Sequence, residues 1–251
     1  RKLQEMIPYR PIHEISLGPI TIKVWGLFVA LGLATALVLA LRRAKLKGIK
    51  QAWVYDIIFY SIVAGLIGSR IGYVLFSWPN NVPRTLLSIL DITKGGLAFT
   101  FGLVAALFVD IAYIIRKKIR MLSFLDFFVP YLVIAHIIGR MGCFFSGEHL
   151  GKQTDFFLGV LVNGVVVHNV AMYEIIILLA ILSTLLYIRR FALPDGMLFA
   201  AYLALYPLLR FPIDFLRSDP TYFGLTAAQY VLIAMFVSSI ILKVYILKHK
   251  K

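Results

Sequence analysis

Long apolar runs separated by short basic connections dominate the pattern of this chain. Seven of them approach the length of a membrane-spanning helix, which needs about 20 mostly apolar residues. They cover residues 20–41, 53–76, 97–115, 125–145, 170–188, 197–216 and 225–247. We read no strand pattern in them, and unpaired backbone groups cost several kcal/mol each in lipid. The pattern therefore predicts an all-α, polytopic membrane protein with seven transmembrane helices, forming a single transmembrane domain over residues 1–251.

The composition supports a membrane protein and excludes or disfavours other classes of protein. Residues of the hydrophobic set make up 61% of the chain and charged residues only 15%, yet the formal net charge is +14. Such hydrophobicity excludes a disordered chain and leaves little polar surface for a nucleic-acid binder. Cys143 is the single cysteine, which excludes an internal disulfide or a multi-cysteine metal cluster. Because the chain starts at Arg1 and not at Met, we expect that its native start was trimmed or processed.

The basic residues predict how the chain crosses the membrane. Fifteen Lys and Arg residues lie in the connections after the first, third and fifth runs and at the C-terminus, whereas the opposite connections and the N-terminal segment hold seven. Since basic residues gather on the cytoplasmic side, we expect a cytoplasmic C-terminus and an N-terminus outside. In the outer connection at about residues 146–169, Asn163-Gly164 between β-branched residues predicts a short hairpin, with a disordered loop as the alternative.

Apart from Lys243, which is counted above with the C-terminus, four basic residues fall inside the apolar runs. They are Lys23, Arg70, Arg140 and Arg210. An ionisable group near the bilayer centre costs at least about 2.5–3.5 kcal/mol, so each is a candidate functional residue. Lys23 lies close enough to the end of its predicted helix to extend to the interface. Arg70 is surrounded by small residues, and helix packing with a carboxylate partner is its alternative.

Arg210 and Arg140 carry the strongest pattern of the four. One helical face is expected to hold Tyr206, Arg210, Asp214 and Arg217. A structural Arg210–Asp214 ion pair is the alternative there. Arg140 begins a glycine-rich stretch that also contains Cys143 and Glu148. Because a guanidinium matches the geometry of a phosphate and glycines allow a ligand to approach the backbone, this stretch predicts a site for a lipid headgroup.

Residues 139–151, with the sequence GRMGCFFSGEHLG, resemble the signature G-R-x-G-N-F-x-N-x-E-x-x-G of the prolipoprotein diacylglyceryl transferases. Further segments resemble motifs of this family in the same order, at residues 24–27, 69–76, 95–99, 168–174, 206–217 and 224–229. The resemblance covers nearly the whole chain. It implies a cell-membrane enzyme that transfers a diacylglyceryl group from phosphatidylglycerol to the lipobox cysteine of a prolipoprotein signal peptide, forming a thioether and releasing glycerol phosphate.

The resemblance also implies roles for individual residues. Arg140 would bind the headgroup phosphate, Arg210 would stabilise the leaving group or activate the thiolate, and Glu148 and Tyr206 would orient these arginines. The remaining substrate-binding candidates are Arg70, Arg217, Gly151, His168, Cys143, Trp25 and Thr100. The reaction would need no metal and no cofactor. The expected partners are phosphatidylglycerol, the signal peptide and other membrane lipids, and no nucleic acid.

The sequence departs from the family at several of these positions. Cys143 replaces a usual asparagine, Trp25 replaces a tyrosine, and Thr100 replaces a histidine that is often proposed as the base. His149 or His168 could take over as the base, since an imidazole titrates near neutral pH. The rival hypothesis is a non-catalytic lipid-binding or transporter-like relative. Transporters usually show an internal symmetry of interrupted helices, and none is visible in this sequence.

Overall fold

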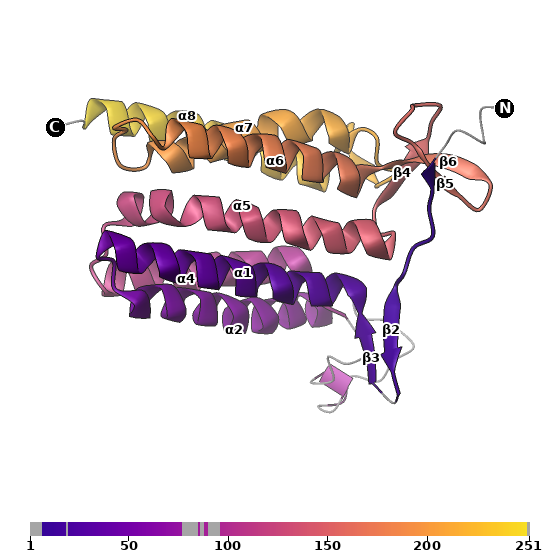
Figure 1. The fold of residues 1–251 in the computed structure, drawn as a ribbon, viewed down its shortest axis with the longest axis horizontal. Helices are drawn as coiled ribbons and strands as arrows, with labels where there is room; N and C mark the ends of the chain where they lie inside the picture. The colour runs from indigo at the N-terminus through magenta and orange to yellow at the C-terminus, as the bar shows by residue number, and fades with distance from the viewer. Residues whose placement is uncertain (1–6, 19, 77–84, 86–87, 90–95, 250–251) are drawn as a thin grey trace. The chain divides into compact units, whose positions relative to one another are not determined.

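The computed structural model describes residues 7–18, 20–76, 85, 88–89 and 96–249, and the chain folds there mainly into helices (Figure 1). These are α1 (Val24–Lys47), α2 (Gln51–Phe76), α4 (Phe99–Arg116), α5 (Met121–Ser146), α6 (Val170–Ile188), α7 (Met197–Asp214) and α8 (Ala227–Lys248). Among the described residues, six of these helices are long and apolar enough to span a membrane, namely α1, α2, α5, α6, α7 and α8. The predicted multi-pass helical class is therefore confirmed, and each of the seven apolar runs contains one of these helices.

The beginning of the first apolar run is an exception to the helical prediction. Residues Ile20–Lys23 form strand β3, which pairs antiparallel with β2 (Glu14–Leu17), and helix α1 begins only at Val24. The prediction that Lys23 lies in a helix is therefore wrong. It is the exposed last residue of β3 and stands opposite Glu14. The physical reason is local, because I-T-I-K alternates apolar and polar residues with the period of a strand.

The predicted hairpin is confirmed. Strands β5 (Val160–Val162) and β6 (Val165–Asn169) pair antiparallel, and Val162 faces Val165 across the turn. Asn163 and Gly164 both have positive φ, 49° and 82°, as a type I′ turn requires. β4 (Leu150–Gln153) and β1 (Ile7–Pro8) complete a four-stranded sheet in the order β1-β5-β6-β4. A separate pair is formed by β7 (Thr221–Tyr222) and β8 (Leu225–Thr226).

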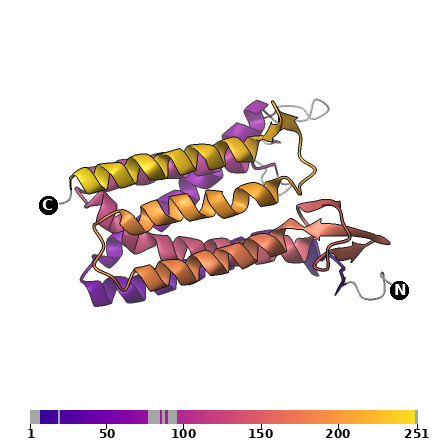
Figure 2. The same cartoon turned by 90° about the horizontal axis from the view of Figure 1, so that it is seen from above.

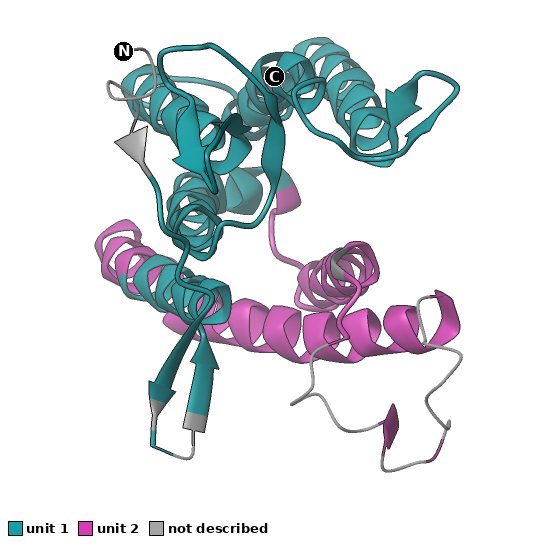
Figure 3. Cartoon of the chain, turned by 90° about the vertical axis from the view of Figure 1, so that its right-hand side faces the viewer, with its two compact units in different colours: residues 1–38, 122–251 teal, residues 39–121 magenta. Residues whose placement is uncertain are grey.

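The chain divides into two compact units, which Figure 3 colours separately. Unit 2 comprises residues 39–121, and in it α2 packs closely against α4. A Cβ atom at Gly68 would lie 2.4 Å from the Cβ of Ala105, so only glycine fits at this crossing. The small residues that surround Arg70 in the sequence therefore form a close-packing face on α2.

Two carboxylates of unit 2 link α2 and α4. Ser61 donates a hydrogen bond of 2.7 Å to Asp110, and the hydroxyl of Tyr113 donates to Asp56. Both carboxylates thus have a structural partner on the facing helix.

Unit 1 comprises residues 1–38 and 122–251 and contains an apolar core between α5, α6 and α7. Val133, Leu178 and Leu198 are among its buried side chains. Figure 2 shows α6, α7 and α8 running side by side, in agreement with their packing. α6 starts at a buried Asn169, whose side chain accepts a hydrogen bond from the N–H of Met172. The core that packs α5, α6 and α7 together therefore also sets the positions of the side chains at the ends of these helices.

Candidate active site

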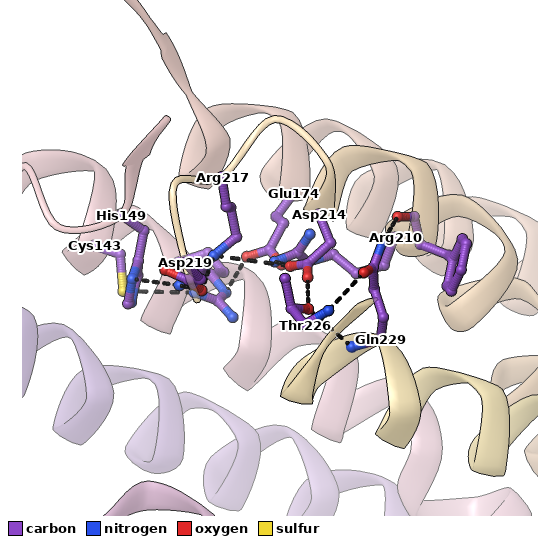
Figure 4. A network of polar contacts seen from close by, with 11 residues as sticks. Cys143, His149, Glu174, Arg210, Asp214, Arg217, Asp219, Thr226 and Gln229 are labelled. Carbon is purple, nitrogen blue, oxygen red and sulfur yellow. Dashed lines mark hydrogen bonds and ion pairs between the residues drawn. The ribbon is translucent and has the colours of Figure 1, made fainter. Parts of the chain in front are cut away.

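A buried carboxylate, Glu174, joins two arginines from different helices. Glu174 lies in the first turns of α6 and is 0% exposed. Arg140, near the end of α5, places Nε against Oε2, and Arg210, near the end of α7, places Nε against Oε1. Figure 4 shows Glu174 and Arg210 within one continuous polar network. Three helices therefore meet at one charged centre at the same end of unit 1.

Asp214 holds Arg210 from a second side. Arg210 Nη2 lies 2.8 Å from Asp214 Oδ1, and the hydroxyl of Thr226 donates a hydrogen bond to Oδ2 of the same carboxylate. Thr226 caps α8 together with Gln229 in a capping box. Arg217 adds a longer contact of 3.8 Å to Asp214. The Arg210–Asp214 ion pair that the sequence left as an alternative is thus present, but as one part of a larger network that continues to Glu174.

One donor of this network is left over. Arg210 is only 4% exposed, and its Nη1 has no hydrogen-bond partner among the described residues. A buried donor without a partner costs about 1–3 kcal/mol, so such a group calls for an explanation. An anion that enters the site would satisfy it, and two guanidiniums from α5 and α7 would share the negative charge.

Two aromatic side chains, Tyr206 and His136, lie beside the charged centre formed by Glu174 and the two arginines. Tyr206 lies close enough to Arg140 for its hydroxyl to interact with the guanidinium, and the rings of His136 and Tyr206 lie 5.3 Å apart. The structure therefore brings together three of the four catalytic candidates, Arg140, Arg210 and Tyr206. The fourth, Glu148, takes no part in the ion pairs that Glu174 and Asp214 form within the described residues, and stands beside Cys143 instead.

A second polar cluster lies next to Arg140, where α5 ends. The ligand atoms of Cys143, Glu148 and His149 all lie within 4.8 Å of one another. Arg140 Nη1 is 4.0 Å from Cys143 Sγ, and Arg217 Nη2 is 3.2 Å from His149 Nδ1. Burial and the positive charges of Arg217 and Arg140 lower the pKa of His149 to about 4, so that its imidazole is neutral at pH 7.

Three other candidates of unit 1, Trp25, His168 and Gly151, are not part of the ion pairs around Glu174 and Asp214. Trp25 lies where α1 crosses α5, because a Cβ atom at Gly142 would come within 3.1 Å of its Cα. His168 Nδ1 lies 2.9 Å from the hydroxyl of Tyr173, and burial lowers the pKa of His168. Gly151 lies where β4 passes the end of α7, next to His168.

Arg70 and Thr100 belong to unit 2. Arg70 donates hydrogen bonds to the backbone carbonyls of Ser88, Ile89 and Gly96, at 2.8, 2.7 and 2.9 Å. These hydrogen bonds go to carbonyls and not to the carboxylate that the sequence suggested as an alternative. Thr100 is exposed at the beginning of α4. Roles for these two residues in substrate binding stay predictions.

Glu174 is the central residue that the sequence did not place in the site. It was visible as an acidic residue in an apolar run and within a resembling motif, but its helical spacing gave no hint of a partner. Its two arginine partners lie 34 residues before it and 36 residues after it along the chain. An unpaired carboxylate in a predicted membrane helix is itself the pattern that indicates such a partner, since buried charges are paired.

Comparison with known proteins assigns this arrangement to a family. The family model described as prolipoprotein diacylglyceryl transferase matches residues 13–245. The chain belongs to the prolipoprotein diacylglyceryl transferase family. It is 32% identical to the phosphatidylglycerol–prolipoprotein diacylglyceryl transferase of Finegoldia magna, over 94% of both chains. It is 34% identical to the protein of the same name from Clostridioides difficile, over 92% of this chain and 94% of the relative. The resemblance seen in the sequence is thereby confirmed.

Gly151→Ala is expected to destabilise this prolipoprotein diacylglyceryl transferase family member by about 1–3 kcal/mol, as overpacking typically does. A Cβ atom at Gly151 would lie 2.5 Å from the carbonyl oxygen of Leu216, a backbone atom that cannot swing away. We expect a lower unfolding temperature in detergent. Gly26→Ala is the matched control, because nothing lies within 4 Å of its Cβ position in α1, and it should keep the unfolding temperature. Equal temperatures for both variants would contradict the close approach at Gly151.

Proposed function

We propose that this chain is a membrane transferase that moves a diacylglyceryl group from phosphatidylglycerol to the thiol of a lipobox cysteine in a prolipoprotein. The observation that carries the proposal is the pair of arginines on buried Glu174, with one donor of Arg210 free to take an anion. A lipid phosphate is the anion that a membrane site of this kind would meet. Relatives named as phosphatidylglycerol–prolipoprotein diacylglyceryl transferases support the same reaction.

The chemistry requires positive charge at the phosphate. The substrate thiolate forms a C–S bond to the glycerol carbon while the C–O bond to the phosphate breaks, and the leaving glycerol phosphate gains negative charge. Preorganised donors aimed at developing charge are usually the largest contribution to catalysis. Arg140 binds the phosphate and Arg210 stabilises the leaving group, while Glu174 and Asp214 hold Arg210 in place. Tyr206 orients Arg140, and Glu148 contributes from the neighbouring cluster.

The other candidates bind substrate in this proposal, and those of unit 1 surround this centre. They are Arg70, Arg217, Gly151, His168, Cys143, Trp25 and Thr100. Lys152 and Arg217 close the end of α7, where Lys152 Nζ donates to the carbonyl of Phe215 at 2.9 Å. The position of the family's proposed base is Thr100, whose hydroxyl is not a base near neutral pH, so the thiol has to be activated by another group.

The chain crosses the cell membrane seven times in this proposal, with its N-terminus outside and its C-terminus in the cytoplasm. The six helices long enough to span and the apolar α4 supply the seven crossings. The basic connections after α1, α4 and α6 then lie in the cytoplasm. The charged network at the ends of α5 and α7 lies toward the outer face, where a signal peptide and phosphatidylglycerol would meet.

Cysteine labelling tests this topology. In a Cys143→Ser background, Asp155→Cys places the only thiol in the connection before β5, and Lys117→Cys places it after α4. We expect a membrane-impermeant maleimide to label Asp155→Cys in intact cells and to label Lys117→Cys only after the membrane is opened. Labelling of Lys117→Cys in intact cells would contradict the proposed orientation.

The rival function is binding of a lipid headgroup without chemistry, as in a transporter-like relative. Purified protein in phosphatidylglycerol micelles, supplied with a lipobox peptide, separates the two. We expect thioether-linked diacylglyceryl peptide, detected by its mass. Saturable phosphatidylglycerol binding without any lipidated peptide, under conditions in which a relative from this family is active, would overturn the transferase proposal in favour of the rival.

A further inference from the structure

A small cavity opens beside the charged centre, where α7 ends and α8 begins. Its volume is about 190 Å³, and every residue that lines it belongs to unit 1. Pockets that hold a whole small molecule measure about 300–1,000 Å³, so this cavity has room only for one group of a larger ligand. Its polar lining includes Lys152, Asp214, Arg217, Ser218, Asp219 and Thr221.

The cavity adjoins the network that holds Arg210. Asp214 forms one of its walls, and its Oδ1 lies 2.8 Å from Arg210 Nη2 and 3.8 Å from Arg217 Nε. Figure 4 shows Asp219 beside Arg217 in the same network. Arg210 Nη1 is the donor that lacks a hydrogen-bond partner among the described residues. A group bound in the cavity therefore lies next to the side chains that would hold a phosphate.

Two charged side chains of the lining keep hydrogen-bonding capacity toward a ligand. Asp219 Oδ2 accepts from both Nε and Nη2 of Arg217, at 2.7 Å each, whereas Asp219 Oδ1 has no partner among the described residues. Lys152 Nζ donates at 2.9 Å to the carbonyl of Phe215, which uses one of its three N–H groups. The lining thus offers a carboxylate oxygen that can accept and N–H groups that can donate, which suits a ligand with hydroxyl groups.

We propose that this cavity binds the terminal glycerol of the phosphatidylglycerol headgroup, with Asp219 Oδ1 accepting a hydrogen bond from one hydroxyl and Lys152 Nζ donating to the other. The inference deepens the proposed function and rests on it for the identity of the lipid. Asp219 and Lys152 are then the residues that determine which headgroup is accepted. This role is separate from that of Arg140 and Arg210, which hold the phosphate.

Glycerol matches this lining in size and in chemistry. It is a small group with two hydroxyls on neighbouring carbons, and each hydroxyl can donate and accept a hydrogen bond. It is joined to the phosphate through a single oxygen, so a phosphate held by Arg140 and Arg210 places it next to the adjoining cavity. Because the glycerol stays on the phosphate when the C–O bond to the diacylglyceryl group breaks, the same contacts also hold the leaving glycerol phosphate.

Headgroups of other chemistry fit this lining less well. An alkyl headgroup would displace water from Asp219 and Lys152 and offer no hydrogen bond in return. A site built around a substrate hydroxyl rejects the analogue that lacks it by up to about 10⁴–10⁵-fold. Because the side chain of Asp219 is 41% exposed, water replaces part of the lost contact, and we expect a preference of at least about tenfold. The ammonium of an ethanolamine headgroup would meet Lys152, while the charge of Asp219 is already shared with Arg217.

The test compares two lipids with the same acyl chains, phosphatidylglycerol and phosphatidylpropanol, whose propyl headgroup lacks both hydroxyls. We expect kcat/KM for thioether formation to be at least about tenfold higher with phosphatidylglycerol. Asp219→Ala and Lys152→Met should each reduce this ratio at least about threefold, mainly by a loss of rate with phosphatidylglycerol. The matched control is Asp155→Ala, which changes an exposed aspartate outside this cavity and should keep the ratio.

The ratio separates headgroup binding from a purely structural effect. Asp219 also contacts Arg217, and a displaced Arg217 would lower transfer from both lipids alike and leave the ratio unchanged. A ratio near one in the unmodified chain, or an unchanged ratio in both variants, would overturn the assignment of the cavity although the transferase proposal stands.

Lipid binding to the purified chain without peptide distinguishes this failure from a failure of the proposed function. Native mass spectrometry measures the affinity for each of the two lipids. We expect the preference for phosphatidylglycerol to appear in binding as well. A chain that binds phosphatidylglycerol more tightly than phosphatidylpropanol but transfers from neither would overturn the transferase proposal and support the assignment of the cavity.

Discussion

Arg210→Ala lowers the rate of diacylglyceryl transfer by at least about 10²–10³-fold, the usual cost of removing one preorganised donor from developing negative charge. Arg210 is the most deeply buried cation of the site and the one with a free donor, Nη1. Alanine removes the charge and leaves water, which is less well oriented, to face the leaving phosphate. The measurement is the initial rate of thioether formation with phosphatidylglycerol and a lipobox peptide.

Two further variants make this prediction specific. Arg140→Ala should cause a loss of similar size, because its guanidinium meets the same carboxylate. Arg210→Lys should recover only part of the rate, since an ammonium keeps the charge but loses the planar fork. Arg190→Ala, in the connection after α6, serves as the control and should keep the full rate. An Arg210→Ala protein that folds and transfers at the normal rate would contradict the role of this arginine.

Glu174→Ala is expected to cost about 3–5 kcal/mol of stability, the range observed when one partner of a buried ion pair is removed. Two guanidiniums would lose their shared partner, and Arg210 would keep only Asp214. The expected result is a strongly lowered unfolding temperature in detergent. The surface control is Glu14→Gln at an exposed position of β2, which should leave that temperature unchanged.

A double-mutant cycle keeps the Glu174 prediction testable when the alanine variant does not fold. Glu174→Gln retains the shape of the side chain and removes its charge, and Arg210→Gln removes the charge of its partner. Residues in contact within one network show coupling energies of about 0.5–3 kcal/mol. The two substitutions together should therefore destabilise less than the sum of the single effects. Additive effects would show that Glu174 and Arg210 do not depend on each other.

Much of the fold follows from the length of the apolar runs. All seven contain a helix, because helices satisfy their own backbone hydrogen bonds within one segment. The hairpin was readable from Asn163-Gly164, since few other residue pairs adopt positive φ at both turn positions. The error at residues 20–23 arose because four residues of alternating pattern were absorbed into a longer apolar run. There the local alternation of apolar and polar residues decided the structure, and the apolar character of the whole run did not.

The sequence predicted individual parts of the site but not how these parts are joined. Arg210 and Asp214 form the ion pair that their spacing on one helix indicated, but the expectation that Arg217 continues this helical face is wrong, because α7 ends at Asp214 and Arg217 approaches Asp214 from the turn that follows. Arg140 and Arg210 were each recognisable as costly charges in an apolar run. What joins them is Glu174, and its place between α5 and α7 depends on the packing of three helices over the apolar core. Such a contact depends on tertiary structure, so spacing along the chain could not reveal it.

The most direct measurement follows both products of one reaction. Purified protein receives phosphatidylglycerol with an isotope-labelled glycerol phosphate headgroup and a lipobox peptide with one cysteine, and mass spectrometry counts the products. If Arg140 and Arg210 hold the phosphate while its C–O bond breaks, one labelled glycerol phosphate is released for each thioether that forms. Both products should be lost in Arg140→Ala and Arg210→Ala. A lipidated peptide formed without release of glycerol phosphate, or no lipidated peptide at all, would contradict it.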